Sequence, residues 1–291
     1  MFIFPKMYKT IISLFLLIAC FSSCIKDDTS DCPDPARITI EIKDKNYDNI
    51  GEIEKEIPVP EDLPMLSYID GMSVWWHLLG APESHSAIVA LSRLEMQHVL
   101  DTDPMADGTN EILVIGNELI PAETYNRASM RRELHPGNSE YADIYMGSAD
   151  IQVPVTVDET IPMYRTKGKL LLEIENLPAT VSRIVVNASG VYETVGKGLS
   201  YEGTIDVSKS FPVSSENNYD MLLAPSLAAD GTALTVELYD DNNIKTVLSG
   251  MTITMTRNEI TLAKLEYTSN EWSFSLFLNG DWAYIDHLTI Q

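Results

Sequence analysis

Residues 37–43 read Arg-Ile-Thr-Ile-Glu-Ile-Lys, and this short stretch indicates the fold more clearly than any other part of the chain. Its three isoleucines, Ile38, Ile40 and Ile42, alternate with polar residues. Because successive side chains of a β-strand point to opposite faces, the alternation predicts a strand with one buried face and one face in solvent. Isoleucine and threonine are also enriched in strands.

The same alternation recurs in the second half of the chain. Residues 251–256 repeat it, and residues 169–175 place three apolar side chains on one face, namely Leu170, Leu172 and Ile174. We expect both stretches to be strands of sheets that have one wet face. Residues 234–239 and 244–248 flank the turn Asp240-Asp241-Asn242-Asn243, whose residue types tolerate the positive φ of hairpin turns. This arrangement predicts a hairpin.

A second hairpin is predicted at the C-terminus. Bulky apolar residues alternate with smaller or polar ones from Trp272 to Leu278, and Asn279-Gly280, the pair preferred in a type I′ turn, follows them. The last strand is then expected over residues 282–290.

Helix signals are sparse, and one short helix over residues 91–100 is the most that the spacing predicts. Many short alternating strands separated by turns indicate an all-β sandwich or barrel, and two such units fit 291 residues. Asp158, Glu159 and Pro162 interrupt the alternation, so we place the boundary there. The predicted domains are an N-terminal β-sandwich at 37–160 and a C-terminal β-sandwich at 161–291.

Residues 1–23 have the character of a signal peptide, with Lys6 and Lys9 before an apolar run at residues 10–21. This run is shorter than the roughly 20 residues that a membrane-spanning helix needs. Phe21-Ser22-Ser23-Cys24 resembles a lipobox, which makes Cys24 the expected lipidation site. Residues 17–20 have a similar order and leave Cys20 as an alternative. Residues 24–36 form an acidic tether.

The cysteines and the charge limit the remaining possibilities. Once Cys20 is removed and Cys24 is acylated, only Cys32 is left, so no disulfide can form within the mature chain. The formal net charge of −23 argues against nucleic acid and anionic lipid headgroups as partners. Because no internal disulfide is expected, burial of the core must stabilise the fold.

No pattern in the sequence points to catalysis. The histidines do not show the i, i+4 spacing of a helical metal site, and no Gly-x-Ser-x-Gly elbow occurs. We therefore expect no enzyme activity, no metal and no cofactor. Trp75-Trp76 is a possible ligand contact, because adjacent strand residues face opposite ways and one indole can remain exposed to stack on a sugar.

Several short stretches resemble the FimB/Mfa-type fimbrial anchor lipoproteins of the fimbrillin, or type V, pilus system. The acidic tether at residues 24–33 joins two cysteines, and Lys26, Asp27 and Asp28 resemble a surface-export signal. The other similar stretches are residues 108–117, 141–147, 164–177 and 278–282. Residues 72–100, with the tryptophan pair, depart from the family pattern.

The resemblance implies two tandem transthyretin-like β-sandwiches in a protein that tethers polymerised fimbrillin to the outer membrane at the fimbrium base, with other pilus subunits as partners. Open sandwich edges allow a partner to add a strand. The candidate for strand exchange is the C-terminal hairpin, although an ordinary core hairpin fits equally well; its residues are Trp272, Phe274, Leu276, Leu278, Trp282, Tyr284, Leu288 and Ile290. A surface glycan-binding lipoprotein that uses Trp75 or Trp76 is the alternative function.

Overall fold

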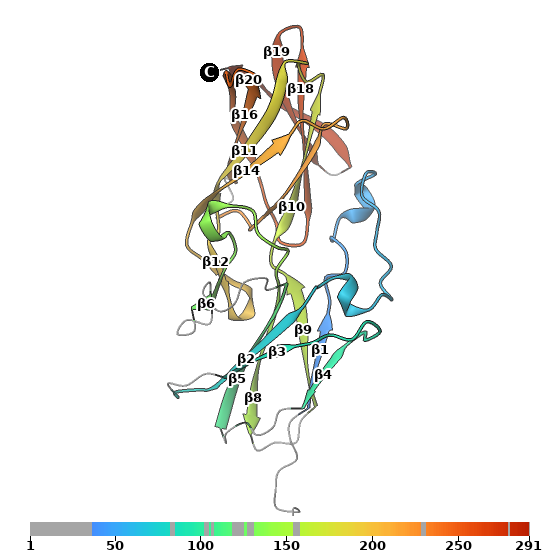
Figure 1. Cartoon of the computed structure of the whole chain (residues 1–291), viewed down its shortest axis with the longest axis vertical. Helices are drawn as coiled ribbons and strands as arrows, with labels where there is room; N and C mark the ends of the chain where they lie inside the picture. Colours follow the sequence, from blue (N-terminus) through green and yellow to red (C-terminus); the bar gives the residue numbers. More distant parts are fainter. Residues whose placement is uncertain are drawn as a thin grey trace, which may run out of the picture. The chain divides into compact units, whose positions relative to one another are not determined.

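The computed structural model describes residues 37–81, 85–101, 105, 108–117, 125–126, 131–153, 158–227, 231–278 and 280–290 (Figure 1). The predicted signal peptide, Cys24 and the export residues Lys26, Asp27 and Asp28 lie outside these ranges. The described residues form strands and a few short 3₁₀ turns without an α-helix, so the predicted all-β class is confirmed. None of them belongs to a helix long and apolar enough to cross a membrane.

The first sandwich contains seven strands in the order β3-β2-β5-β8-β9-β1-β4. All neighbours are antiparallel except β1 and β9, which run parallel. The strands are β1 (Arg37–Ile42), β2 (Met72–Leu78), β3 (His85–Val89), β4 (His98–Asp101), β5 (Gly108–Gly116), β8 (Tyr145–Val153) and β9 (Asp158–Arg165). One core cluster joins the isoleucines of β1 to apolar residues of β2, β5, β8 and β9, which shows that the sheet folds into two packed layers.

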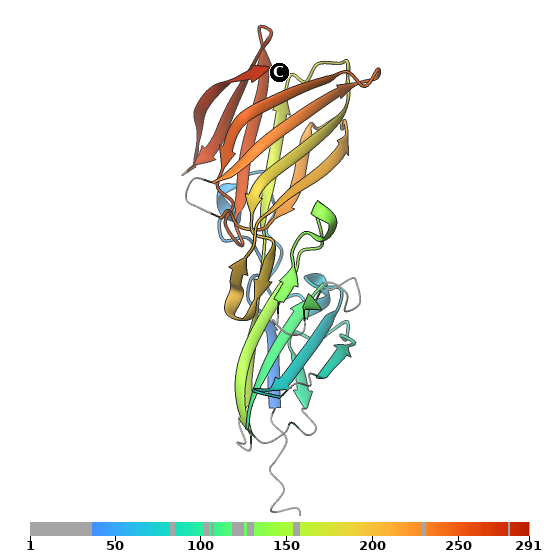
Figure 2. The same cartoon turned by 90° about the vertical axis from the view of Figure 1, so that its left-hand side faces the viewer.

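The second sandwich has nine strands in the order β14-β11-β16-β17-β20-β19-β18-β10-β15, and Figure 2 shows its C-terminal strands in red. They are β10 (Gly168–Glu175), β11 (Val181–Val191), β14 (Ile205–Pro212), β15 (Asn218–Leu223), β16 (Thr232–Asp240), β17 (Lys245–Ile253), β18 (Ile260–Thr268), β19 (Glu271–Leu278) and β20 (Asp281–Ile290). Its core joins β10, β18 and β19 to β11, β16 and β17.

Seven strands of the second sandwich repeat the topology of the first. In chain order, the corresponding strands are β10, β11, β14, β15, β16, β17 and β18 in the second sandwich and β1, β2, β3, β4, β5, β8 and β9 in the first. Corresponding strands have corresponding neighbours except that β17 and β18 are separated, and the parallel pair of β10 and β18 matches that of β1 and β9. The hairpin β19–β20 lies between β18 and β17, whereas β9 and β8 meet directly, so it has no counterpart among the described residues of the first sandwich. The described residues therefore form two tandem sandwiches, of which the second carries an appended hairpin.

A small third sheet connects segments from the two halves of the chain. Its order is β13-β12-β7-β6, with β6 (Tyr125–Asn126), β7 (Arg131–Glu133), β12 (Thr194–Gly196) and β13 (Ser200–Glu202). The 3₁₀ turn η5 (Lys197–Leu199) joins β12 to β13. The other short 3₁₀ turns are η2 (Ile50–Glu52), η3 (Met65–Ser67) and η4 (Pro136–Asn138).

Most of the predicted strands are confirmed. Strand β1 buries Ile38, Ile40 and Ile42 as the alternation requires. The two predicted hairpins are β16–β17 and β19–β20. In the turn of the second hairpin, Gly280 has a φ of 83°, and Asn279 lies outside the described residues. Strand β9 continues the first sheet to Arg165, and β10 opens the second sheet at Gly168.

Two predictions are wrong. Residues 91–100 form no helix, because Leu94 is 84 % exposed instead of sharing a buried face with Leu91, and the segment ends in β4, which pairs with β1. Strand β10 has no wet face, because Leu171 is only 6 % exposed. A cluster that includes Ile53 and the partly buried Tyr47, from the segment after β1, covers this second face.

Candidate interaction surfaces and the buried junction

The C-terminal hairpin divides its predicted contact residues between core and surface. Trp272 and Phe274 lie in the core at 2 % and 0 % exposed, and Leu276 and Leu288 pack against it. Trp282 packs on the opposite face with Phe277. Leu278 and Tyr284 are about half exposed, and the side chain of Ile290 is outside the description. The hairpin thus packs on both faces in this subunit, and its exposed apolar side chains are those near the turn and the bulge.

Among the described residues, no strand pairs with the outer edge of β20 over most of its length. It pairs with β17 only through Leu248↔Ile290 and Ser249↔Thr289, whereas its inner edge pairs with β19 from Asp281 to Leu288. A bulge leaves Ile285 without a partner on β19, and this side chain is 47 % exposed beside Tyr284 at 55 %. Unpaired backbone groups next to exposed apolar side chains are the features that strand addition uses.

A second opening lies in the first sandwich, between β8 and β9. The two strands pair only at Tyr145↔Arg165 and Met146↔Tyr164 and then separate into different layers. Pro162 has no N–H to continue the ladder. A side chain at Gly147 would place its Cβ 2.5 Å from the carbonyl oxygen of Pro162, so glycine is needed where the strands cross. We call this opening the β8/β9 seam and define it by residues 147–152 and 158–162.

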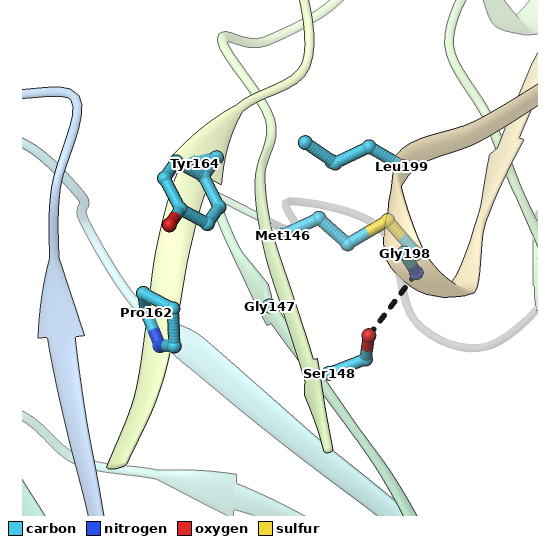
Figure 3. A pocket seen from close by; sticks show the side chains of 7 residues that line it. All are labelled: Met146, Gly147, Ser148, Pro162, Tyr164, Gly198 and Leu199. Carbon is cyan, nitrogen blue, oxygen red and sulfur yellow. Dashed lines mark hydrogen bonds between the residues drawn. The ribbon is translucent and has the colours of Figure 1, made fainter.

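A cavity of about 150 Å³ lies at the closed end of the seam (Figure 3). It is lined by Met146, Gly147, Ser148, Pro162, Tyr164, Gly198 and Leu199. The lining comes from β8, from β9 and from the η5 turn, and most of it is apolar. The volume corresponds to roughly five water molecules, so it fits one aliphatic side chain and not a drug-sized ligand.

The η5 turn is fixed against β8 by polar contacts. The Gly198 N–H donates to Ser148 Oγ at 3.1 Å (Figure 3), and the Lys197 ammonium contacts Glu111 at 2.7 Å and Asp150 at 2.5 Å. Burial lowers the pKa of Lys197, but the hydrogen bonds to these two carboxylates outweigh it, so the net shift is upward. Leu199 has a φ of +58°, which is unusual for a bulky residue.

The most extensive polar network in the described residues lies where β9 leads to β10. The Arg165 guanidinium donates to Asp143 at 2.7 Å and to Asn258 Oδ1 at 2.7 Å, and it stacks 4.1 Å from the ring centre of Tyr47. Asp44 accepts the Arg165 N–H at 2.9 Å and pairs with Arg257. The network therefore ties together the segment after β1, the residues that lead into β8 and the β17–β18 turn.

Buried titratable groups surround this junction. Lys167 is 0 % exposed and donates to the Tyr141 carbonyl at 3.0 Å, and burial lowers its pKa to about 7. Burial also lowers the pKa of His135 to about 3, with the Lys167 charge acting in the same direction. Burial raises the pKa of Asp143, against the opposing effect of Arg165. Sequence reasoning missed this junction, because no periodicity or motif links residues so far apart.

The tryptophan pair differs in accessibility. Trp75 is 6 % exposed, lies in the core, and its indole N–H donates to Ser73 Oγ at 3.2 Å. Trp76 is half-buried against the other core and stacks on His85 with ring centres 5.9 Å apart. Of the two predicted ligand contacts, only Trp76 has surface available. Ligand contact itself stays a prediction.

The histidines do not gather into one site. His77 contacts Glu111 at 3.0 Å, and His98 contacts Glu95 at 3.1 Å, in separate pairs. In the described part of the chain, no group of three or more His, Cys, Asp and Glu side chains is arranged to hold a metal ion.

Comparison with known proteins identifies the fold. No family model and no curated protein matches the chain. A candidate adhesin from Bacteroides thetaiotaomicron superimposes with a TM-score of 0.54 at 10 % identity, covering 87 % of this chain and 99 % of that one. A candidate polysaccharide-binding protein from the same organism gives 0.53 at 11 % identity, covering 86 % and 98 %.

The fimbrial anchor protein Mfa2 from Porphyromonas gingivalis is also similar, with a TM-score of 0.46 at 10 % identity over 87 % of this chain and 100 % of that one. Identities this low show a shared fold and nothing more. The chain therefore shares the all-β fold of the two Bacteroides thetaiotaomicron structures.

Proposed function

We propose that this protein is a non-catalytic fimbrial anchor or minor subunit. It tethers polymerised fimbrillin to the outer membrane through acylated Cys24 and through strand-addition contacts with other pilus subunits. The observation that carries the proposal is the appended hairpin: β19–β20 is additional to the repeated topology, and the outer edge of β20 is open beside Tyr284 and Ile285. Similarity in fold to a candidate adhesin supports a role in attachment.

Lipidation supplies the other half of the tether. Each buried methylene of an acyl chain contributes about 0.8 kcal/mol, and two or more chains on one residue suffice for stable anchoring. The proposal assigns these chains, such as palmitate, to Cys24, and assigns surface export to Lys26, Asp27 and Asp28. The protein would then be an outer-membrane lipoprotein exposed on the cell surface.

Replacing Cys24 tests the membrane attachment. We expect Cys24→Ala to move the protein from the membrane fraction to the soluble fraction, because no thiol remains at the lipobox for acylation. Cys20→Ala is the matched control, and it should leave the protein in the membrane. Immunoblots of the two fractions, with mass spectrometry of the mature N-terminus, give the readout. Release by Cys20→Ala instead would place the lipid four residues earlier.

Lysines placed on the outer edge of β20 test the proposed contact with fimbrillin. We expect Tyr284→Lys combined with Ile285→Lys to shed about tenfold more fimbrillin into the medium, because lysines on an exposed edge oppose strand pairing. The melting temperature of the purified variant should stay close to that of the wild type, since both side chains are about half exposed. Ile244→Lys, at a 66 % exposed position in the β16–β17 turn, is the control. Unchanged fimbrial retention would rule out this edge.

Glycan binding remains the second candidate function, and one observation favours it. Trp76 keeps part of its indole accessible, and the fold is shared with a candidate polysaccharide-binding protein. Titration of the wild type and of Trp76→Ala against a glycan panel separates the two functions. Glycan binding that is lost in Trp76→Ala would support the second function, whereas the anchor role requires no glycan binding.

A further inference from the structure

We propose that one end of the second sandwich holds a binding site for a single neutral pyranose sugar, seated between the aromatic ring of Tyr267 and the carboxylate of Asp240. This site is separate from the outer edge of β20, and it is separate from Trp76, which belongs to the first sandwich. The inference goes beyond the anchor role and does not depend on it.

A cavity of about 210 Å³ lies at the end of the second sandwich where β16 turns into β17. Its walls come from both layers. In the layer of β11, β16 and β17, Leu238 pairs with Thr246, and Asp240 follows Leu238 on the same face of β16. In the layer of β18 and β19, Tyr267 pairs with Trp272. The core between the two layers thus ends in a cavity that is polar on one side and aromatic on the other.

The size of the cavity fits one sugar ring. Its volume corresponds to roughly seven water molecules, and a hexose occupies a similar volume. The cavity is open to solvent on one side, because Thr180 and Ile244 in its lining are exposed. A single ring at the end of a longer glycan can therefore enter.

Tyr267 supplies the aromatic wall. Its ring centre lies 5.0 Å from that of Trp272, and the two ring planes are inclined by 38°. Its hydroxyl donates to Asn270 Oδ1 at 3.1 Å, so the ring is held in place before a ligand arrives. Tyr267 is half-buried and keeps surface available, whereas Trp272 is only 2 % exposed. The apolar C–H face of a pyranose packs on such a ring, and a ring that is already fixed loses little entropy on binding.

Asp240 supplies the hydrogen-bond acceptor on the opposite wall. Its Oδ1 accepts the backbone N–H groups of Asn242 and Ile244, each at 2.8 Å, which fixes the carboxylate. Its Oδ2 has no hydrogen-bond or ion-pair partner among the described residues and is available to a ligand. Thr180 and Thr246 add two hydroxyl groups, which can both donate and accept. Ligand hydroxyls that donate to Asp240 form charge-assisted hydrogen bonds.

The lining selects a neutral ligand. The described residues that line the cavity include no lysine or arginine, and the chain has a formal net charge of −23, so a carboxylated sugar would be repelled. A quaternary ammonium ion would satisfy Asp240, but it offers no hydrogen bond to the two threonine hydroxyls. The hydroxyls of a pyranose can pair with all three side chains.

The experiment uses the mature, full-length protein and the methyl glycosides of glucose, galactose and mannose. Saturation-transfer NMR detects binding, and titration gives the Kd. We expect at least one glycoside to bind with a Kd on the order of 1 mM. Because the ligand is neutral, the Kd should stay the same between about 50 and 500 mM salt. Methyl glucuronide and tetramethylammonium are the control probes, and both should bind at least about tenfold more weakly.

Substitutions in the cavity locate the site. Tyr267→Leu keeps an apolar side chain but removes the ring, and it should weaken binding about tenfold. Asp240→Asn keeps an acceptor for the turn N–H groups but removes the charge, and it should weaken binding about threefold to tenfold. Trp76→Ala is the matched control and should change the Kd less than about twofold. The asparagine variant keeps the test valid if Tyr267→Leu lowers the melting temperature.

Three results would overturn the inference: no binding of any of the three glycosides, binding of tetramethylammonium alone, or glycoside binding that both cavity variants retain. Loss of binding in Trp76→Ala alone would place the sugar in the first sandwich instead. Retention of fimbrillin on cells tests the anchor role separately, so either proposal can fail without the other.

Discussion

Replacing Arg165 with methionine should destabilise the protein by about 4 kcal/mol, the largest effect that we expect from a single substitution outside the apolar core. Arg165 is 7 % exposed and holds Asp143, Asn258 and the Tyr145 hydroxyl together. Methionine fills a similar volume but donates no hydrogen bond. Asp143 then loses the ion-pair partner that favours its charged form, and two buried polar groups lose their donor.

Urea unfolding of the wild type and the variant measures this difference. For a protein of this size the loss corresponds to a melting temperature lower by roughly 10 °C. Arg183→Met is the matched control, because this arginine also stacks on a tyrosine, Tyr239, at 3.8 Å, but lies near the surface. Its expected cost is below about 1 kcal/mol. A similar cost for both arginines would contradict the assignment.

A double variant tests whether the pair itself matters. Asp143→Asn removes the charge that Arg165→Met leaves without a partner, so the double variant should be about 1–2 kcal/mol more stable than the sum of the single effects predicts. Strictly additive costs would mean that Arg165 acts through its hydrogen bonds to Asn258 and Tyr145, and not through Asp143.

The alternation in the sequence predicts strands well wherever one face meets a core. Residues 37–43 and the C-terminal hairpin are examples, because their apolar side chains recur every second position and the strands bury that face. The same logic fails at Leu171, on the face of β10 expected to be wet. A segment more than a hundred residues earlier covers it through Tyr47 and Ile53, and no local pattern encodes such a contact.

The candidate sites, like the strands, can be predicted from the sequence only in part. The sequence predicts the hairpin, but only the structure shows that Tyr284 and Ile285 are half exposed while Trp272 and Phe274 are core residues. The β8/β9 seam has no sequence signal of its own. Pro162 interrupts the alternation in the sequence, and in the structure it lies within β9 just beyond the last residue that pairs with β8. Both sites depend on which strands are neighbours, and this is a property of topology.

The second large effect concerns acid. His135 is 1 % exposed, its Nε2 accepts the Ala224 N–H at 3.0 Å, and its Nδ1 lies 3.3 Å from the Ser139 carbonyl, which fits a neutral ring with the proton on Nδ1. Burial holds the pKa of His135 at about 3, against an ordinary value of 6.5. Between pH 6.5 and about 3, His135 is therefore protonated in the unfolded chain but stays neutral in the folded chain.

It follows that His135 makes the protein less stable as the pH falls from 6.5 towards 3, by about 1.4 kcal/mol for each pH unit. Asp143 acts in the opposite direction at the lower end, because burial raises its pKa. Comparing the wild type with a His135 variant separates the contribution of His135 from that of Asp143. In urea unfolding from pH 7.5 to 4.5, His135→Gln should lower stability at pH 7.5 but reduce the slope below pH 6.5.

His85→Gln, at an exposed position, should keep the wild-type slope. Parallel curves for wild type and His135→Gln would show that His135 does not titrate in this range. A reduced slope would mean that His135, which lies between Ser139 and Ala224, accounts for the loss of stability as the pH falls. Acid would then weaken the contact between His135 and the backbone of Ala224, because the protonated ring would point an N–H at the N–H of Ala224.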